Sequence, residues 1–217
     1  KRGLVDQRKQ KNIEESLVKM TVMMNRPFSD VDNPHFRQLL YAAEPNFICP
    51  SAKKHTSKFD EMAVEVKKSL KKEIIKDVTE AGHKTIIVTS DHGTSGDRLM
   101  TKENAVTVAR TTEDFVIKKD IVKMLVCKEV QTGKQIKTEV KGALEEGAGY
   151  DESWLVDWVT DGEAKQLNAT EPSNHPEVKM KIAHRGKCVD HTLELGSEET
   201  NNQCPNTKIP VHKVWAL

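Results

Sequence analysis

The sequence predicts an α/β protein in which a helical region precedes a mixed sheet. Apolar residues recur at helical spacing through most of the first eighty positions, and short runs of β-forming residues dominate after them. Two of those runs, 85–90 and 154–160, read as buried strands, and each leads directly into an aspartate, Asp91 or Asp161. The matched pair of strand and aspartate is the pattern around which we interpret the rest of the chain.

The helical region is predicted to contain three helices. The first covers about 7–24 and stops before Pro27, because its apolar residues keep helical spacing up to that point. Asn33 followed by Pro34 predicts the start of a second helix that runs to about Ala43. A third, long helix is expected from a cap at Thr56 or Ser57 to the neighbourhood of Gly82. These apolar stripes exceed what one small sheet needs, so we expect part of them to lie exposed for a partner chain or DNA.

Beyond Gly82 the order of the elements predicts the topology of the sheet. Segments 104–111 and 120–128 are expected to be antiparallel partners of the first strand, and a helix follows from Thr132 to Gly147. A right-handed crossover then places the strand at 154–160 parallel to the first strand and beside it. This order is that of a ribonuclease H-like fold. We expect 170–185 to be a loop and 187–195 to be a short strand or turn that leads into a helix.

Three domains follow from these elements. They are a helical region at 1–82, a partial ribonuclease H-like domain at 83–200 and an irregular tail at 201–217.

Asp91 and Asp161 are the candidate catalytic and metal-binding residues. A carboxylate at the carboxyl end of a buried strand is held rigidly while its oxygens face the solvent. Neighbouring parallel strands would bring both carboxylates to one edge of the sheet, where they could share Mg²⁺ or Mn²⁺ for phosphodiester chemistry. The competing interpretation is that each aspartate only begins a turn, as aspartates often do. His92 is interpreted as an exposed turn residue, and Trp154 and Trp158 as core.

Length and composition limit the class of protein, but the overall charge does not indicate a partner. With 217 residues and a formal charge of +1, the chain suits one sizeable α/β domain plus a smaller element. Four scattered cysteines do not resemble a secreted disulfide framework, so a reducing compartment is expected. The sequence shows neither a signal peptide nor an apolar run that could span a membrane, so no membrane partner is expected. Because it opens on Lys1, we expect a fragment or an excised domain.

Four short sequence blocks, each different from the others, follow one another along the chain. They are Arg26-Pro27-Phe28-Ser29 with Val31 and Asn33-Pro34-x-Phe36, followed by Pro50-Ser51 and Thr56; Thr89-Ser90-Asp91 with Thr94-Ser95; Trp158-Val159-Thr160-Asp161 with Ala164 and Asn168; and Cys188-x-x-His191-x-Leu193-x-Leu195. In their order and spacing these blocks resemble the hAT superfamily of DNA transposases and its domesticated descendants. The resemblance covers roughly residues 20–196.

This resemblance implies a function and its partners. It implies a DDE-type nuclease and strand transferase with Asp91 and Asp161 as two of its three catalytic acids. It further implies Mg²⁺ or Mn²⁺ as cofactor, transposon-end DNA as partner, a homo-oligomer in full-length form, and a nuclear location. The chain departs from the family pattern at Gly93, where many members have tryptophan. It also lacks the family's third acid, a glutamate, together with the amino-terminal BED zinc finger and the carboxy-terminal dimerisation segment.

Cys188 and His191 are candidate supporting residues. Their spacing is compatible with zinc if Cys204 and His212 complete a tetrahedral set, but a packed cysteine and a hydrogen-bonded histidine beside the active site is the favoured interpretation. Glu163, Asp190 and Glu194 are the nearby acids considered as substitutes for the missing glutamate.

Two classes of function therefore remain open. One is a metal-dependent transposase that is truncated before its third acid, so that the chain by itself is expected to be inactive. The other is a non-catalytic descendant that keeps the fold as a DNA- or protein-binding module.

Overall fold

The computed structural model describes residues 6–94, 102–127 and 131–188. The chain divides into two compact units, residues 1–68 and 69–217. The division falls inside a long helix, whereas the sequence placed the domain boundary after that helix, at residue 82. It falls there because the carboxyl-terminal part of the helix buries Ile74 and Val78 in the core of the second unit.

The first unit consists of helices around a small apolar core. In chain order these are α1 (Gln7–Met23), the 3₁₀ turn η1 (Phe28–Asp32), α2 (Pro34–Ala43) and the start of α3 (Ala52–Glu80). Asn33 caps α2 as predicted, because its side chain accepts hydrogen bonds from the backbone N–H groups of His35 and Phe36. The core of this unit contains Leu17, Val31, Phe47 and Cys49.

The helical pattern of the sequence was wrong in two details. The helix α3 begins at Ala52, before the expected cap at Thr56 or Ser57, because the Ser51 hydroxyl accepts a hydrogen bond from the Lys54 N–H and caps it earlier. The spacing of Phe36, Leu39, Leu40 and Tyr41 in the sequence predicts that they form one apolar face of α2, but Leu39 is 65% exposed.

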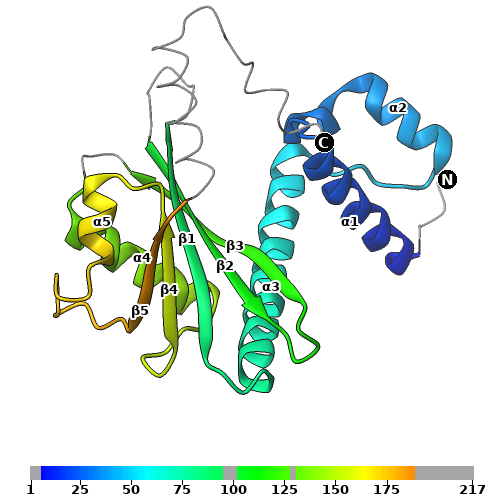
Figure 1. Ribbon diagram of the computed structural model, residues 1–217. Coiled ribbons are helices and arrows are strands. Elements are labelled where there is room, and N and C mark those ends of the chain that lie inside the picture. Colours follow the sequence, from blue (N-terminus) through cyan, green and yellow to red (C-terminus); the bar gives the residue numbers. More distant parts are fainter. Residues whose placement is uncertain (1–5, 95–101, 128–130, 189–217) are drawn as a thin grey trace, which may run out of the picture. The chain divides into compact units, whose positions relative to one another are not determined.

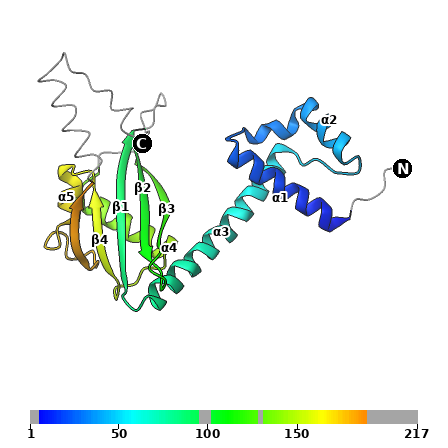
Figure 2. The ribbon, with the colours of Figure 1, turned by 45° about the vertical axis from the view of Figure 1, so that its right-hand side comes forward.

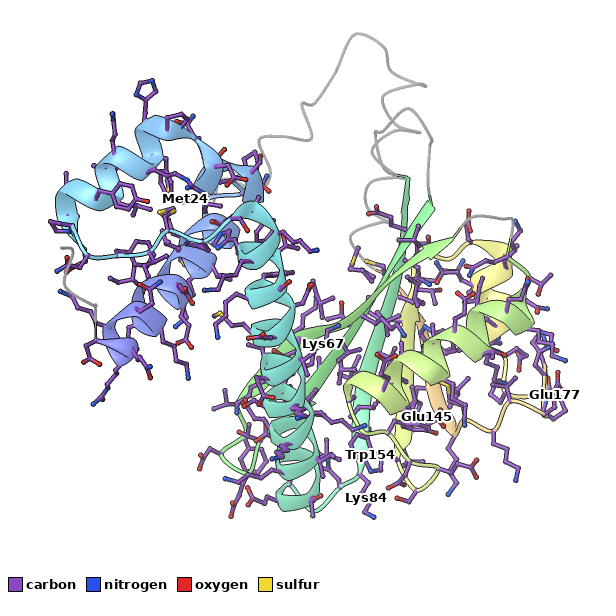
Figure 3. All side chains as sticks on the ribbon, turned by 180° about the vertical axis from the view of Figure 1, so that it is seen from behind. Met24, Lys67, Lys84, Glu145, Trp154 and Glu177 are labelled. Atoms are coloured by element: carbon purple, nitrogen blue, oxygen red, sulfur yellow. The ribbon has the colours of Figure 1, made fainter. Side chains whose placement is uncertain are left out.

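Some of the apolar stripe of the first unit is exposed, as predicted. Met24 at the end of α1 is 64% exposed and Met23 is 85% exposed (Figure 3). The nature of any partner for these side chains stays a prediction.

The second unit is a mixed α/β domain built on a five-stranded sheet (Figure 1). Its strands lie in the order β3-β2-β1-β4-β5. The elements that follow α3 are β1 (Thr85–Thr94), β2 (Lys102–Thr111), β3 (Ile117–Cys127), α4 (Gly133–Gly147), β4 (Leu155–Thr160), α5 (Ala164–Thr170) and β5 (Ile182–Lys187).

The pairing of the strands agrees with the predicted topology. The first three strands are antiparallel neighbours, and β4 lies parallel to β1 with Ser90 opposite Thr160 as their last pair. The helix α4 makes the crossover between β3 and β4, and a capping box at Thr132 fixes its start. Figure 2 shows the sheet from the side, with α4 behind it.

Helices cover one face of this sheet. Alternate residues of β1 and β4, such as Val88 and Trp158, are fully buried in one core with residues of α3, α4 and α5. Ile87, which precedes Val88 in β1, is 43% exposed. Trp154, labelled in Figure 3, is 3% exposed just before β4, so both tryptophans belong to the core as predicted.

Two expectations about the strands were wrong. The strand β1 does not end at Asp91: it continues to Thr94 because β2 still pairs with it there, so His92 lies in a strand and not in a turn. Residues 182–187 form β5 parallel to β4, although 170–185 was expected to be a loop. This strand lacks the sequence pattern of a strand because it is a largely exposed edge strand, whose position depends on backbone pairing with β4.

Candidate functional site

The candidate site lies where the parallel pairing of β1 and β4 ends. Ser90 and Thr160 are the last paired residues, and each is followed by one of the two aspartates. Asp91 therefore follows the last residue of β1 that pairs with β4, and Asp161 follows the last residue of β4. The carboxylate of Asp91 lies outside the described part of the structure, so the separation of the two carboxylates remains a prediction.

Asp161 forms the turn that was the competing interpretation of this residue, and its role as a metal ligand stays a prediction. Its Oδ1 accepts a hydrogen bond from the Glu163 N–H at 2.9 Å, which makes a turn into α5. The Thr160 hydroxyl accepts from the Gly162 N–H at 3.3 Å, and Gly162 adopts a φ of 91°, which favours glycine. The other carboxylate oxygen of Asp161, Oδ2, makes no hydrogen bond with a described residue, so it can still face a ligand.

A buried hydrogen-bonded network lies directly beneath this edge of the sheet. The Trp158 indole N–H donates to the Ser90 hydroxyl oxygen at 2.8 Å. The Ser90 hydroxyl in turn donates to the Gln166 side-chain oxygen at 2.9 Å. All three side chains are fully buried. The network thus joins β4, β1 and α5 next to the two aspartates.

The structure brings Cys188 to the same edge of the sheet. Its backbone N–H donates to the Thr160 carbonyl at 2.6 Å, just after the end of β5, and its thiol is not in a disulfide. His191, Cys204 and His212 lie outside the described residues, as do Asp190 and Glu194. Glu163 is exposed and immediately precedes α5.

Asn168, part of the third sequence block, makes its hydrogen bonds with the loop that follows α5. Its side-chain oxygen pairs with the His175 ring at 2.9 Å, and its backbone carbonyl accepts from the Asn174 side chain. A Cβ at Gly133 would lie 2.2 Å from the Asn168 oxygen, so α4 and α5 approach closely there. Asn168 therefore holds the loop after α5 against the start of α4.

The described donor set fits a cation only in part. Among the residues that the structure describes, no group of three or more histidine, cysteine or acidic side chains could hold a metal ion. The chemistry of two aspartates on adjacent strands, one with an open oxygen, nevertheless suits a hydrated Mg²⁺ or Mn²⁺, which keeps several waters.

Sequence reasoning missed the network beneath the aspartates. Trp158 was interpreted only as core, and neither Ser90 nor Gln166 was given a role. The signal was present, because a serine inside a strand buried on one face must find a hydrogen-bond partner. The identity of that partner depends on the diagonal from β4 and on the direction of α5, which local sequence does not contain.

Comparison with known proteins does not assign the chain to a family. No protein-family model matches the chain, and a search of curated proteins finds no match either. None of the helices in the described ranges carries an apolar stretch long enough to cross a bilayer.

Proposed function

We propose that the chain is part of the ribonuclease H-like catalytic region of a hAT-type DNA transposase. The observation that supports this proposal is the strand order β3-β2-β1-β4-β5, with β1 and β4 parallel and an aspartate next to their last pair. Transposon-end DNA is then the substrate, a homo-oligomer is the full-length form and the nucleus is the place of action.

In this proposal Asp91 and Asp161 hold the metal. When bound, Mg²⁺ supplies Lewis-acid stabilisation to the oxygens of a phosphodiester. The protein contributes the backbone positions of the two aspartates, and the turn at Gly162 holds one Asp161 oxygen while the other makes no hydrogen bond with a described residue. No third acid joins them among the described residues. Without a further ligand, charge on the leaving oxygen is poorly stabilised, which typically costs about 10²–10³ in rate.

A second candidate is a non-catalytic module that keeps this fold to bind DNA or protein. The hydrogen bond between Asp161 and the Glu163 N–H favours it, because that bond gives the aspartate a purely structural reason to be present.

Binding of Mn²⁺ to the full chain, followed by electron paramagnetic resonance, separates the two candidates. We expect Asp91→Asn and Asp161→Asn each to weaken Mn²⁺ binding at least about tenfold. The matched control is Asp157→Asn, which changes another aspartate of β4 that pairs with His184 at 2.8 Å instead of lying at the strand end. Equal Mn²⁺ affinity in all four proteins would contradict the metal site and favour the binding module.

Nicking of supercoiled plasmid with Mn²⁺ tests the catalytic step. We expect the chain as given to cut slowly or not at all, with no difference between it and Asp161→Ala. Robust nicking that Asp161→Ala abolishes would contradict this expectation and make the chain a complete nuclease.

A further inference from the structure

The face of the sheet opposite the helices, which we call the open face, exposes apolar side chains. Strand alternation places six large ones there, with exposed fractions from 43% to 73%: Ile87, Ile117, Ile121, Met124, Val126 and Leu155. Among the described positions of β1 to β4 on this face, the charged residues are Glu103, Lys119 and Asp157. A contiguous apolar surface of this kind marks an interaction site.

A simpler explanation is that the open face is the solvated side of an antiparallel sheet. Antiparallel sheets do keep one face in water, but that face is then polar. Two pairs of this sheet are parallel, β1 with β4 and β4 with β5, and parallel strands are normally covered on both faces. The composition of the open face and the parallel pairs therefore both indicate that a partner covers it.

Opposite charges lie at the two ends of one row across the open face. From β3 through β2 and β1 to β4, this row consists of Lys119, Ala109, Ile87 and Asp157. Lys119 is exposed and makes no ion pair with a described residue, whereas Asp157 pairs with the exposed His184 ring at 2.8 Å. Lys119 and Asp157 are equally far from the line that runs between β2 and β1.

The neighbouring rows have matching residue types at their two ends. The next row consists of Ile121, Thr107, Thr89 and Val159, with apolar ends and two threonines between them. On the other side of the charged row, Ile117 of β3 and Leu155 of β4 are the end residues. The open face is therefore complementary to itself when the order of each row is reversed.

We propose that the open face binds the open face of a second copy of the chain, about a two-fold axis that runs along the strands between β2 and β1. This axis lays each row on its own reverse. Lys119 of each copy then faces Asp157 of the other, and the small Ala109 faces the larger Ile87. In the neighbouring rows, Ile121 faces Val159 and Ile117 faces Leu155.

Sheet geometry and charge favour this axis over the alternative across the strands. The strands of the two sheets run in the same direction, which matches the aligned packing of sheets at about −30° and about 10 Å. An axis across the strands would lay β3 on β3 and β4 on β4, so Lys119 could not reach Asp157. Like charges would then be brought together instead of opposite ones.

The size of the open face predicts a specific but weak dimer. Five strands about 4.8 Å apart give a footprint of about 20 by 25 Å, or roughly 500 Å², whereas standard interfaces bury about 800 Å² per partner. The described residues of the face include no tryptophan or tyrosine, the side chains that most often dominate binding energy. We therefore expect a dissociation constant of about 10–100 µM. At about 1 µM the chain is then monomeric, so unfolding free energies measured there refer to the monomer.

Sedimentation velocity of the full chain between about 1 and 300 µM tests the dimer by charge exchange. Lys119→Asp and Asp157→Lys should each weaken self-association at least about tenfold, because each variant brings two like-charge pairs together. An equimolar mixture of the two variants should associate about as strongly as the wild type, since the mixed dimer regains both opposite-charge pairs. A wild type that stays monomeric over the whole range would overturn the dimer. A mixture that associates no better than its components would overturn the two-fold arrangement.

Ile121→Asp tests the apolar part of the open face. We expect it to abolish self-association, because it places a charge against Val159 of the second copy. Val66→Asp is the matched control: Val66 is 64% exposed, similar to Ile121 at 62%, but lies on α3, so its change should leave self-association within about twofold. Circular dichroism checks that both variants keep their helices and strands. Equal loss of self-association in both variants would overturn the assignment of the interface to the open face.

This inference goes beyond the proposed function and does not depend on it. All samples contain a metal chelator, so association is measured without a divalent cation. Self-association with equal Mn²⁺ affinity in the aspartate variants would leave the dimer standing and the metal site wrong. A monomeric wild type whose Mn²⁺ binding requires Asp161 would show the reverse.

Discussion

The Arg110 guanidinium is buried between α3 and the sheet and is surrounded by charged groups. Its side chain is 1% exposed, its Nε donates to Asp77 at 2.8 Å, and its terminal nitrogens pair with Asp120 and Glu73. Burial alone would raise the pKa of Asp77, but hydrogen bonds from Arg110 and Lys118 outweigh burial and hold that pKa below its usual value. This cluster attaches the carboxyl-terminal part of α3 to β2 and β3.

We expect Arg110→Ala to lower the free energy of unfolding by about 3–5 kcal/mol, because it leaves the buried Asp77 carboxylate without its main partner. Urea unfolding at neutral pH measures the change. Lys119→Ala is the control: Lys119 is an exposed neighbour on β3, and its removal should change the free energy of unfolding by less than about 0.5 kcal/mol. Equal effects of the two substitutions would show that the cluster does not stabilise the domain.

His55 gives the helical unit a dependence on pH. The ring is 1% exposed, and its Nε2 lies 3.0 Å from the Thr21 hydroxyl. Burial lowers the pKa of His55 in the folded protein. The unfolded chain therefore binds a proton more readily, so the stability from neutral His55 is present above about pH 6.5 and is lost as the pH falls below it.

Thermal unfolding by circular dichroism at pH 7.5 and 5.5 tests this dependence. We expect the unfolding midpoint of the wild type to fall more between the two pH values than that of His55→Gln. His35→Gln, which changes an exposed histidine, should behave like the wild type. A wild type and a His55→Gln variant with the same pH dependence would contradict the assignment.

At the scale of elements, two glycines of α4 have opposite surroundings. A Cβ at Gly147 would lie 2.8 Å from the Val122 carbonyl oxygen, so α4 ends in close contact with the backbone of β3. Gly142, in the same helix, has nothing within 4 Å of its Cβ position. We therefore expect Gly147→Ala to destabilise the domain, because a backbone group must move. Gly142→Ala should stabilise it by about 0.5–1 kcal/mol, because alanine is the better helix former. Urea unfolding of the pair provides the comparison, and destabilisation by Gly142→Ala would contradict it.

At the scale of the whole molecule, the two compact units have separate cores. Leu17 belongs to the core of the first unit and Ile74 to that of the second. Trp154 and Trp158 both lie in the second unit, whereas helices of both units contribute to circular dichroism. Fluorescence and circular dichroism can therefore follow different parts of the chain.

We expect Leu17→Ala, in a Trp215→Phe background, to shift the urea transition seen by circular dichroism more than that seen by fluorescence. Ile74→Ala should shift the fluorescence transition, and each truncation should cost about 2–5 kcal/mol in its own unit. Identical shifts of both signals in both variants would mean that the two units unfold as one.

The sequence by itself determined the features that depend on local interactions. Asn33 with Pro34 predicted the start of α2, and Thr132 predicted that of α4, because caps act within one turn of helix. Alternating and apolar runs predicted β1 to β4, and the right-handed crossover predicted that β4 lies beside β1. The same local patterns and the crossover rule are sufficient to place Asp91 and Asp161 on adjacent strands.

Tertiary structure alone decided the features that depend on partners distant in sequence. β5 forms because β4 offers an unpaired edge, and β1 passes Asp91 because β2 still pairs with it. The partners of Ser90 were fixed only when β4 and α5 met β1. A local pattern records which backbone conformation a segment favours, but a hydrogen bond between segments depends on where folding places both of them.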